Sequence, residues 1–200
     1  TAPLTAKGLE DTALYNFNRL ASLNEVGGDP DRFGCALDTF HEFVRDRRRL
    51  WPRSMNSTST HDSKRGEDVR ARINVLAELP EEWEYNLQLW RDLNRDKRGA
   101  DGDRAAPDAN EEYLLYQTLI GTWPVDPADT ASFSARLKEY VVKAAREAKA
   151  HTSWLTPDTE YEALLTDFVA RILDPAPQNR FLEAFYPFAQ KVMHYGAFNS

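Results

Sequence analysis

A histidine and an aspartate stand side by side in the segment STSTHDSKRGEDVR, which covers residues 57–70. Four small hydroxyl residues precede His61-Asp62, and two cations, Lys64 and Arg65, follow. A carboxylate at the carboxyl end of a barrel strand points into an active-site mouth, and an imidazole beside it can bind hydroxyl groups. The two cations would keep such a carboxylate ionised, because a nearby opposite charge favours the charged form. The same order of residues also suits a solvated turn.

A second group of charges lies near the start of the chain, in the sequence AKGLED. It places Lys7 against Glu10 and Asp11 at the expected start of a helix, where an intrahelical salt bridge is the simple explanation. The later sequence LNEVGGDP is typical of a helix terminus, because Gly-Gly and Asp-Pro end helices. Its Asn24 and Glu25 give no independent indication of chemistry.

Two other stretches carry residues that could bind a ligand. The run RDRRRLWPR (45–53) could grip phosphates, but its place on an expected helix with acidic neighbours favours a solvated basic face. His151 lies near Trp154, which suits a helix end packed by an aromatic ring. The sequence has no glycine-rich phosphate loop, zinc-ligand spacing or His-Glu-x-x-His pattern, so it predicts neither a metal nor a cofactor.

Composition limits the classes of protein to be considered. Of the 200 residues 42% are apolar and 28% are charged, which predicts a packed protein rather than a disordered one. A net charge of −7 disfavours nonspecific binding to nucleic acid or an anionic membrane, and there is no run of about 18 apolar residues to span a bilayer. The single Cys35 excludes an internal disulfide, and the N-terminus lacks a signal-peptide pattern. A cytoplasmic protein is expected.

Hydrophobic periodicity predicts a mainly α-helical chain. The expected helices cover 8–24, 34–50, 67–79, a stretch through Trp83, Leu87 and Trp90, 110–123, 130–150, 158–173 and a last stretch from Phe181 to Val192. The apolar residues that should share the inward face of the first helix are Leu9, Ala13, Leu14, Phe17, Leu20 and Ala21. The second helix should direct Leu37, Phe40 and Val44 inward and end before the proline of LWPR.

Two stretches lack this periodicity. The sequence SMNSTST is rich in serine and threonine, and it predicts one short strand near 54–61. The 96–110 stretch, DKRGADGDRAAPDAN, combines glycine, aspartate and proline, and it predicts a long exposed loop. The expected chain is thus helical with one short extended interruption, and that interruption carries His61-Asp62.

Three stretches together resemble one enzyme family. They are AKGLEDTALYNFNRLASLNEVGGDP, STSTHDSKRGEDVRARINVLAELPEEW and REAKAHTSWLTPDTEYE. They look like segments of the maltooligosyl trehalose synthases, a family of the α-amylase superfamily of glycoside hydrolases. Intervening helical sequence such as YLLYQTLIGTWP fits the same family, and the resemblance covers nearly all 200 residues. Matches of this length in this order are highly specific.

The resemblance implies a retaining (β/α)8-barrel enzyme, a glucan glucosylmutase of the isomerase class. Such an enzyme converts the reducing-end α-1,4 bond of a maltooligosaccharide into an α,α-1,1 bond, a step of trehalose biosynthesis. Asp62 would be the third catalytic carboxylate, which stabilises the oxocarbenium-like charge, and His61 would bind hydroxyl groups of the same glucose. Three regions are implied: a helical cap segment (1–53), a barrel strand end with its catalytic loop (54–66) and a helical subdomain (67–200).

Retaining chemistry also needs a nucleophile and a general acid, whose carboxyl groups lie about 5 to 5.5 Å apart. The resemblance places both on barrel strands outside these 200 residues, so it implies an internal piece of the enzyme, a helical insertion or cap region. The remainder of the barrel chain is then the expected partner. The isolated chain is expected to be inactive, and no cofactor is implied.

Complementary charges in two of the matching motifs suggest how transfer could prevail over hydrolysis. Residues 7–50 would form a cap over the reducing-end subsites, and exclusion of water would let the released glucose rotate and attack again. The residues assigned to substrate binding on this basis are Lys7, Glu10 and Asp11, which should face Lys64 and Arg65, together with His61.

Two other interpretations stay open from the residues alone. A metal-dependent phosphohydrolase of the His-Asp type would use His41, His61 and Asp62. Such sites lie on helices and need further ligands, whereas this pair follows an extended stretch. The second interpretation is a non-catalytic helical interaction module, and turnover of a maltooligosaccharide by the isolated chain would distinguish it from an enzyme.

Overall fold

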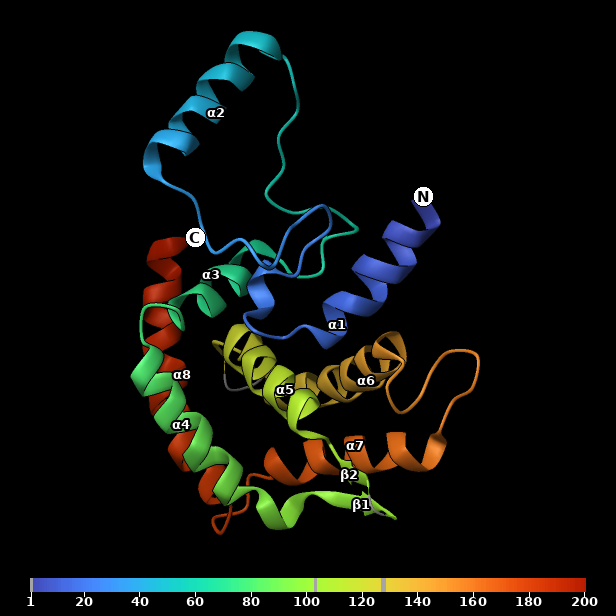
Figure 1. The fold of residues 1–200 in the computed structure, drawn as a ribbon. Helices are drawn as coiled ribbons and strands as arrows, with labels where there is room; N and C mark the ends of the chain where they lie inside the picture. The colour runs from blue at the N-terminus through green and yellow to red at the C-terminus, as the bar shows by residue number, and fades with distance from the viewer. Residues whose placement is uncertain (1, 103, 127–128) are drawn as a thin grey trace.

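The structure is a computed structural model that describes residues 2–102, 104–126 and 129–200. Most of the described chain is helical, as the periodicity predicts (Figure 1). The elements are η1 (Leu4–Ala13, a π-helix), α1 (Leu14–Asn16), η2 (Ala21–Leu23), α2 (Leu37–Leu50), α3 (Glu67–Val75), α4 (Pro80–Leu93), η3 (Arg95–Lys97), β1 (Gly99–Asp101), β2 (Arg104–Ala106), α5 (Ala109–Thr122), α6 (Thr130–Ala148), α7 (Thr159–Ile172) and α8 (Arg180–Asn199). Among the described residues, no helix is both long and apolar enough to cross a membrane.

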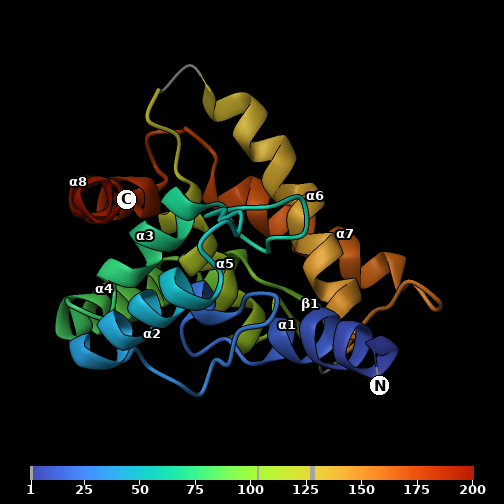
Figure 2. The same ribbon diagram turned by 90° about the horizontal axis from the view of Figure 1, so that it is seen from above.

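Helix α5 lies in the middle of the packed helices (Figures 1 and 2). On one side of it, α3 packs against both α5 and α8, and α8 also contacts α4; on the other side, α6 packs against α7. Every residue of α5 from Leu114 to Gly121 is buried. Gly121 permits the close approach of α3, because a Cβ atom there would lie 2.8 Å from Cγ1 of Val69. Helices α3 and α8 and the short η2 helix therefore take their positions directly from α5.

The core between α4, α5 and α8 is built from aromatic rings. Trp90 is fully buried, and its ring centroid lies 5.1 Å from that of Phe185, 5.6 Å from Tyr116 and 5.9 Å from Phe188. Phe185 also packs against Trp123 at 4.8 Å. Tilted and edge-on ring pairs at such distances stabilise a core beyond the burial of their area. The predicted inward faces of α4 and α8 are confirmed.

The start of the chain is not the single helix predicted for 8–24. Helical structure ends with α1, and an irregular stretch leads to the short η2 helix. The buried side chain of Asn24 accounts for the break. Its amide donates to the carbonyl oxygens of Leu14 (2.8 Å) and Phe17 (2.7 Å), and such bonds compete with those of a helix. Two of the apolar residues predicted to point inward are exposed, namely Leu9 and Phe17.

The predicted strand near 54–61 is wrong, because this segment pairs with no other segment in the described ranges. The two strands that do form, β1 and β2, make an antiparallel hairpin within 96–110, which was predicted to be an exposed loop. Ala106 opposes Gly99 and is fully buried, and a Cβ atom at Gly99 would lie 2.6 Å from Cδ2 of Leu164. The hairpin is thus held by packing against α7. Without a neighbouring strand, the backbone at 54–61 has no ladder to join.

Helix α2 stands apart from the other helices (Figure 1). It ends at Leu50, before Trp51-Pro52, as predicted, but none of its residues is buried. Leu37, Phe40 and Val44 were predicted to point inward, and they are 75%, 51% and 45% exposed. The prediction of an inward face is therefore wrong for this chain, because no part of it that the structure describes covers the apolar side of α2.

The contrast between the core and α2 leads to a stability prediction. Phe185→Ala should lower the free energy of unfolding by about 3–5 kcal/mol, the usual cost of truncating a buried phenylalanine. Phe43→Ala on α2 should change it by less than about 0.5 kcal/mol, because this side chain is 59% exposed. Urea unfolding followed by circular dichroism measures both values. Equal losses for the two variants would contradict the placement of α2 outside the core.

Candidate active-site loop

His61 and Asp62 lie in a turn between the extended segment and α3. The backbone N–H of Thr60 donates to Oγ of Ser63 (2.8 Å), and the N–H of Ser63 donates back to the carbonyl oxygen of Thr60 (3.2 Å). The side chains of His61 and Asp62 are 89% and 72% exposed, with Nε2 and Oδ2 3.1 Å apart. The turn thus presents an imidazole and a carboxylate to the outside while its own hydrogen bonds hold its shape.

Lys64 does not pair with Asp62, contrary to the prediction. Its Nζ lies 2.6 Å from Oδ1 of Asp11, and it stands over the ring of Tyr15 at 5.5 Å. Lys7 approaches the other oxygen of Asp11, Oδ2, also at 2.6 Å. The hydrogen bond from Lys64, followed by that from Lys7, lowers the pKa of Asp11. The predicted contact between the AKGLED motif and Lys64 is therefore confirmed, through Asp11.

Arg65 also turns away from Asp62. Its guanidinium donates from Nη1 to the carbonyl oxygen of Ala21 (3.0 Å) and from Nη2 to the hydroxyl of Tyr140 (3.1 Å). Both cations of the pair therefore have partners other than Asp62. They attach the loop to the surrounding helices instead. Lys64 contacts η1 through Asp11, and Arg65 contacts η2 through Ala21 and α6 through Tyr140.

Glu10 has a different partner from the one predicted. Its Oε1 accepts the backbone N–H of Gly27 at 3.0 Å, so it steadies a turn instead of facing Lys64 or Arg65. Gly27 has φ +71°, a left-handed conformation that suits glycine. Of the three charges in AKGLED, Asp11 contacts the loop, Lys7 does so through Asp11, and Glu10 does not.

Glu25 is the anchor of the loop, and sequence reasoning missed it. Its Oε1 accepts the backbone N–H of Lys64 at 2.9 Å, and its Oε2 lies 3.1 Å from the same nitrogen and 3.5 Å from the N–H nitrogen of Arg65. Nη1 of Arg70 donates to Oε2 at 3.1 Å. Burial works against the charged form, but the N–H donors of Lys64, Val26 and Arg65 and the side chain of Arg70 together lower the pKa of Glu25 below its ordinary 4.5.

The first turn of α3 holds the loop from its other side. Nη2 of Arg70 donates to the carbonyl oxygen of Thr58, and the N–H of Glu67 donates to Oγ of Ser59 at 3.1 Å. Arg70 therefore links Glu25 to the segment just before the His-Asp turn. The sequence gives one indirect signal for Glu25: an acidic residue is needed to pair with some of the cations at 64, 65 and 70.

A buried amide attaches this assembly to α5. Gln117 is fully buried, its Oε1 accepts the N–H of Ala21 (2.7 Å), and its Nε2 donates to the carbonyl oxygen of Asn18 (2.8 Å). Both the oxygen and the nitrogen of this amide thus form hydrogen bonds with the backbone of the segment that leads to Glu25. A satisfied polar group of this kind fixes position as well as contributing stability.

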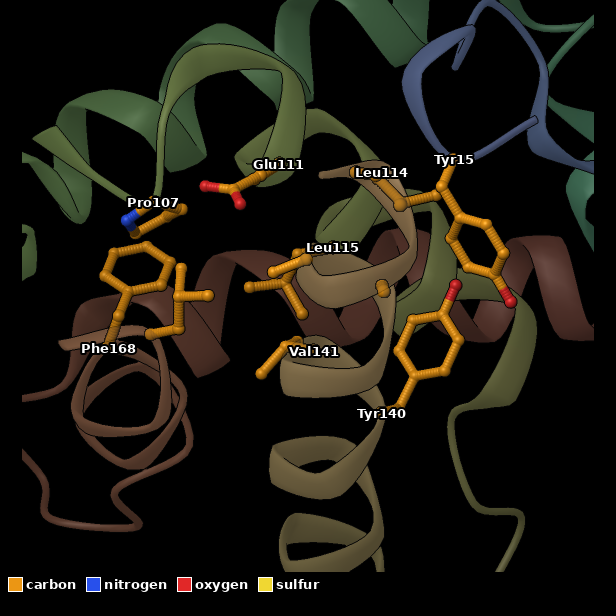
Figure 3. Close-up of a pocket in the computed structure, with 12 residues that line it drawn as sticks. Tyr15, Pro107, Glu111, Leu114, Leu115, Tyr140, Val141 and Phe168 are labelled. Atoms are coloured by element: carbon orange, nitrogen blue, oxygen red, sulfur yellow. The ribbon is translucent and has the colours of Figure 1, made fainter. Parts of the chain in front are cut away.

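Figure 3 shows a pocket beside this assembly, with Tyr15 and Tyr140 at one end and Glu111 toward the other. The space between them is lined mainly by apolar side chains, among them Leu115 and Val141. Its volume is about 30 Å³, far below the roughly 300–1,000 Å³ of pockets that bind small ligands, so it is too small for a sugar ring. Burial raises the pKa of Glu111. The pocket therefore belongs to the packing of α5 and α6, and the exposed turn remains the candidate site.

One cluster among the described residues has the arrangement of a metal site, formed by Asp108, Glu111 and His151, whose ligand atoms lie within 4.8 Å of one another. Each group already has a partner in the fold. Asp108 caps α5 and accepts from His151 at 2.8 Å, and Glu111 accepts from the N–H of Asp108 and the hydroxyl of Tyr161. His151 packs on Tyr161, with ring centroids 4.7 Å apart. The predicted packing of the helix end by Trp154 is confirmed, because its ring lies 4.9 Å from the guanidinium of Arg146 and its Nε1 donates to Glu147 at 3.0 Å, both in the last turn of α6.

The phosphohydrolase alternative finds no support in the geometry. His41 lies on α2, with its ring edge-on to Phe40, whereas His61 and Asp62 lie on the turn before α3. Among the described residues, the three do not form a group with metal-ligand distances. This alternative is wrong for the arrangement of this chain.

The hydrogen bonds of Glu25 predict how the loop responds to mutation and to pH. In Glu25→Gln the backbone N–H groups of Lys64 and Arg65 lose a charged acceptor, so they should exchange with deuterium about tenfold faster, as expected when a charge-assisted hydrogen bond is weakened. Glu10→Gln is the matched control and should leave both rates unchanged. Amide exchange measured by NMR tests the pair of variants.

The lowered pKa of Glu25 fixes the direction of the pH dependence. The stabilisation by Glu25 is complete above its ordinary pKa of 4.5 and is lost as the pH falls through the lowered value in the folded chain. Protection of the Lys64 and Arg65 amides should fall over that acid range in the natural chain and show no such step in Glu25→Gln. Identical pH profiles for the two would contradict the assignment of Glu25 as the anchor.

Comparison with known proteins adds a family to this geometry. No protein-family model matches the chain. A putative maltooligosyl trehalose synthase of Mycobacterium tuberculosis is 44% identical over 171 residues, which make up 86% of this chain and 21% of the relative. The chain thus spans about a fifth of the length of this curated relative.

Solved structures agree with the sequence comparison. The crystal structure of a hypothetical maltooligosyl trehalose synthase of Sulfolobus tokodaii superposes with a TM-score of 0.83 at 38% identity, over 96% of this chain and 25% of that one. The maltooligosyltrehalose synthase of Arthrobacter ramosus superposes with a TM-score of 0.78 at 37% identity, over 98% and 23%. The predicted resemblance is confirmed: in sequence and in fold, this chain corresponds to about a quarter of a maltooligosyl trehalose synthase.

Proposed function

We propose that this chain is part of an isomerase that converts the reducing-end α-1,4 bond of a maltooligosaccharide into an α,α-1,1 bond. The observation that carries the proposal is the His61-Asp62 turn, exposed at its side chains and anchored at its backbone, in a chain related to the maltooligosyl trehalose synthases. The parent enzyme would be a retaining (β/α)8 barrel. In it, 1–53 would form the helical cap segment and 67–200 the helical subdomain. The segment 54–66 would carry the catalytic loop and would form a strand end only beside a neighbouring strand from the rest of the barrel, which 54–61 lacks within the part of the chain that the structure describes.

Asp62 is assigned the role of the third carboxylate. In retaining chemistry a nucleophile and a general acid about 5 to 5.5 Å apart break and remake the glycosidic bond through an oxocarbenium-like transition state. A further carboxylate beside that centre would stabilise the developing positive charge. Because Lys64 and Arg65 bind elsewhere and His61 approaches only Oδ2, Oδ1 of Asp62 stays available to the sugar. The second ring nitrogen of His61, Nδ1, can bind a hydroxyl group.

Lys7 is assigned to the released glucose. Its side chain is 71% exposed, whereas that of Lys64 is only 13% exposed and held by Asp11. An ammonium group has three N–H donors, so besides its contact with Asp11 it can donate to sugar hydroxyls while the glucose rotates. We infer that the cap retains the glucose long enough for its anomeric hydroxyl to attack before water does, so that the product is an isomer rather than two hydrolysis fragments.

The test of Asp62 uses a grafted enzyme, in which these 200 residues replace the matching quarter of the Arthrobacter ramosus synthase. Asp62→Asn should lower kcat for trehalosyl product by about 10²–10³-fold, the usual effect of removing one transition-state stabilising group. The matched control is Asp167→Asn on α7, which should leave kcat unchanged. The isolated 200-residue chain should form no trehalosyl product. Full activity of Asp62→Asn, or product from the isolated chain, would refute this part of the proposal.

The retention of glucose predicts a change in product ratio. In the grafted enzyme, Lys7→Ala should raise the ratio of free glucose to trehalosyl product several-fold, because the glucose escapes or water attacks first. Lys143→Ala, an exposed lysine on α6, is the matched control. Chromatography of the products from maltohexaose measures the ratio. An unchanged ratio in Lys7→Ala would rule out the cap as the cause of transfer.

A further inference from the structure

Helix α2 carries an apolar face that the described chain leaves uncovered. We call this surface the α2 face; its members and their exposed fractions are Leu37 (75%), Phe40 (51%), Phe43 (59%), Val44 (45%), Leu50 (57%) and Trp51 (69%). They recur at spacings of three, four and seven residues, which gathers them on one side of the helix. Arg47 lies on the same side, with its guanidinium 5.9 Å from the centroid of the Phe43 ring, so the α2 face is apolar with one cation within it. Scattered single apolar residues are normal on a protein surface, but large ones gathered on one helix face mark an interaction site.

The opposite side of the same helix is charged. The residues there are Asp38, Glu42, Arg45 and Arg49. A helix divided in this way lies with one side on an apolar surface and the other in water. Both sides of α2 are exposed, so within 2–102, 104–126 and 129–200 no surface covers its apolar side.

The α2 face continues into a groove that leads to the candidate site. The groove lies between α2 and the segment 52–60 and has a volume of about 920 Å³. Phe40, Phe43 and Trp51 are among the residues that line it, and so are Thr58 and Thr60, the second of which directly precedes His61-Asp62. A partner bound to the α2 face would therefore lie beside the turn that carries His61 and Asp62.

The solved relatives indicate which partner covers the α2 face. They superpose on 96–98% of this chain, yet this chain covers only 23–25% of theirs, so three quarters of each relative lies outside the shared part. We propose that the α2 face is an interface within one polypeptide, and that it packs on an apolar surface of the remaining three quarters of the enzyme. This inference rests on the proposed function, since it takes the chain to work as part of the longer synthase.

A second copy of this chain fits the α2 face less well. A helix of 14 residues is about 21 Å long and its apolar side about 10 Å wide, so it offers on the order of 200 Å². Stable dimers bury roughly 800 Å² on each partner. Segments of one polypeptide need no such area, because covalent connection supplies a high effective concentration.

An anionic membrane is also a poor partner. The last turn of α2 carries Arg47, Arg48 and Arg49, but acidic residues interrupt the rest of the helix, and the chain as a whole has a net charge of −7. Amphipathic helices that bind anionic lipid are rich in Lys and Arg on their polar side, whereas this side carries Asp38 and Glu42 as well as Arg45 and Arg49.

Two neighbouring substitutions test the proposal in two contexts. In the isolated chain, Phe43→Ala and Glu42→Ala should both leave Tm unchanged. In the grafted enzyme, Phe43→Ala should lower Tm by several degrees, while Glu42→Ala leaves it unchanged. Loss of Tm in both contexts, or in neither, would overturn the proposal. Because Tm is the readout, the result is independent of whether Asp62 acts in catalysis.

A measurement without any substitution covers the case in which Phe43→Ala prevents folding of the grafted enzyme. The backbone amides of 37–50 should exchange with deuterium at least tenfold more slowly in the unmutated grafted enzyme than in the isolated chain. Equal exchange rates would overturn the proposal.

Two further readouts on the isolated chain address the other partners. Sedimentation velocity should show a monomer, and vesicles containing phosphatidylserine should not retain the chain. A dimer that Phe43→Ala dissociates would assign the α2 face to a second copy instead. Vesicle binding abolished by Phe43→Ala would assign it to a lipid surface instead.

Discussion

The buried amide of Gln117 is the interaction on which the position of the candidate site depends. It lies in the middle of α5, the most deeply buried helix, and both of its polar ends bind backbone groups of the segment 18–21. That segment leads to Glu25, and Glu25 in turn accepts the N–H groups of Lys64 and Arg65. Exposed groups such as His61 and Asp62 could not hold a place by packing. They hold it through this series of hydrogen bonds, which begins in the core.

In the candidate site, the cations that hold the loop are distinct from the exposed groups of His61 and Asp62. Lys64 and Arg65 are spaced like partners for Asp62 in the sequence, but both are used to fasten the loop. A cation bound to Asp62 would compete with a sugar for the same oxygens. Directing the cations to other acceptors leaves the carboxylate open while the loop still gains charge-assisted hydrogen bonds.

Sequence reasoning predicted the helices whose partners lie within the chain, because for those helices the periodic face and the buried face are the same. The stripe of Trp83 and Trp90 is an example. It was wrong about the inward face of α2, since an amphipathic pattern shows that a partner is needed but not that the same 200 residues supply one. The 54–61 strand was wrong for a related reason, because a strand depends on neighbours that its own sequence does not describe.

Glu25 escaped prediction because its partners are mainly backbone N–H groups, which every residue except proline carries. No spacing of residue types marks such a contact. The hairpin at 99–106 was missed in the same way, since the small residues that suggested an exposed loop are the ones that let β1 approach Leu164 closely.

The carboxylate of Asp11 gives one oxygen to each of two lysines, Oδ1 to Lys64 and Oδ2 to Lys7. The two contacts use different oxygens, so loss of one does not remove the acceptor of the other. The side chain of Lys7 is 71% exposed and that of Lys64 only 13%, so salt and solvent reach the contact of Lys7 first. Loss of the exposed contact therefore leaves Lys64 paired with Asp11, and the loop that carries Asp62 keeps its attachment to η1.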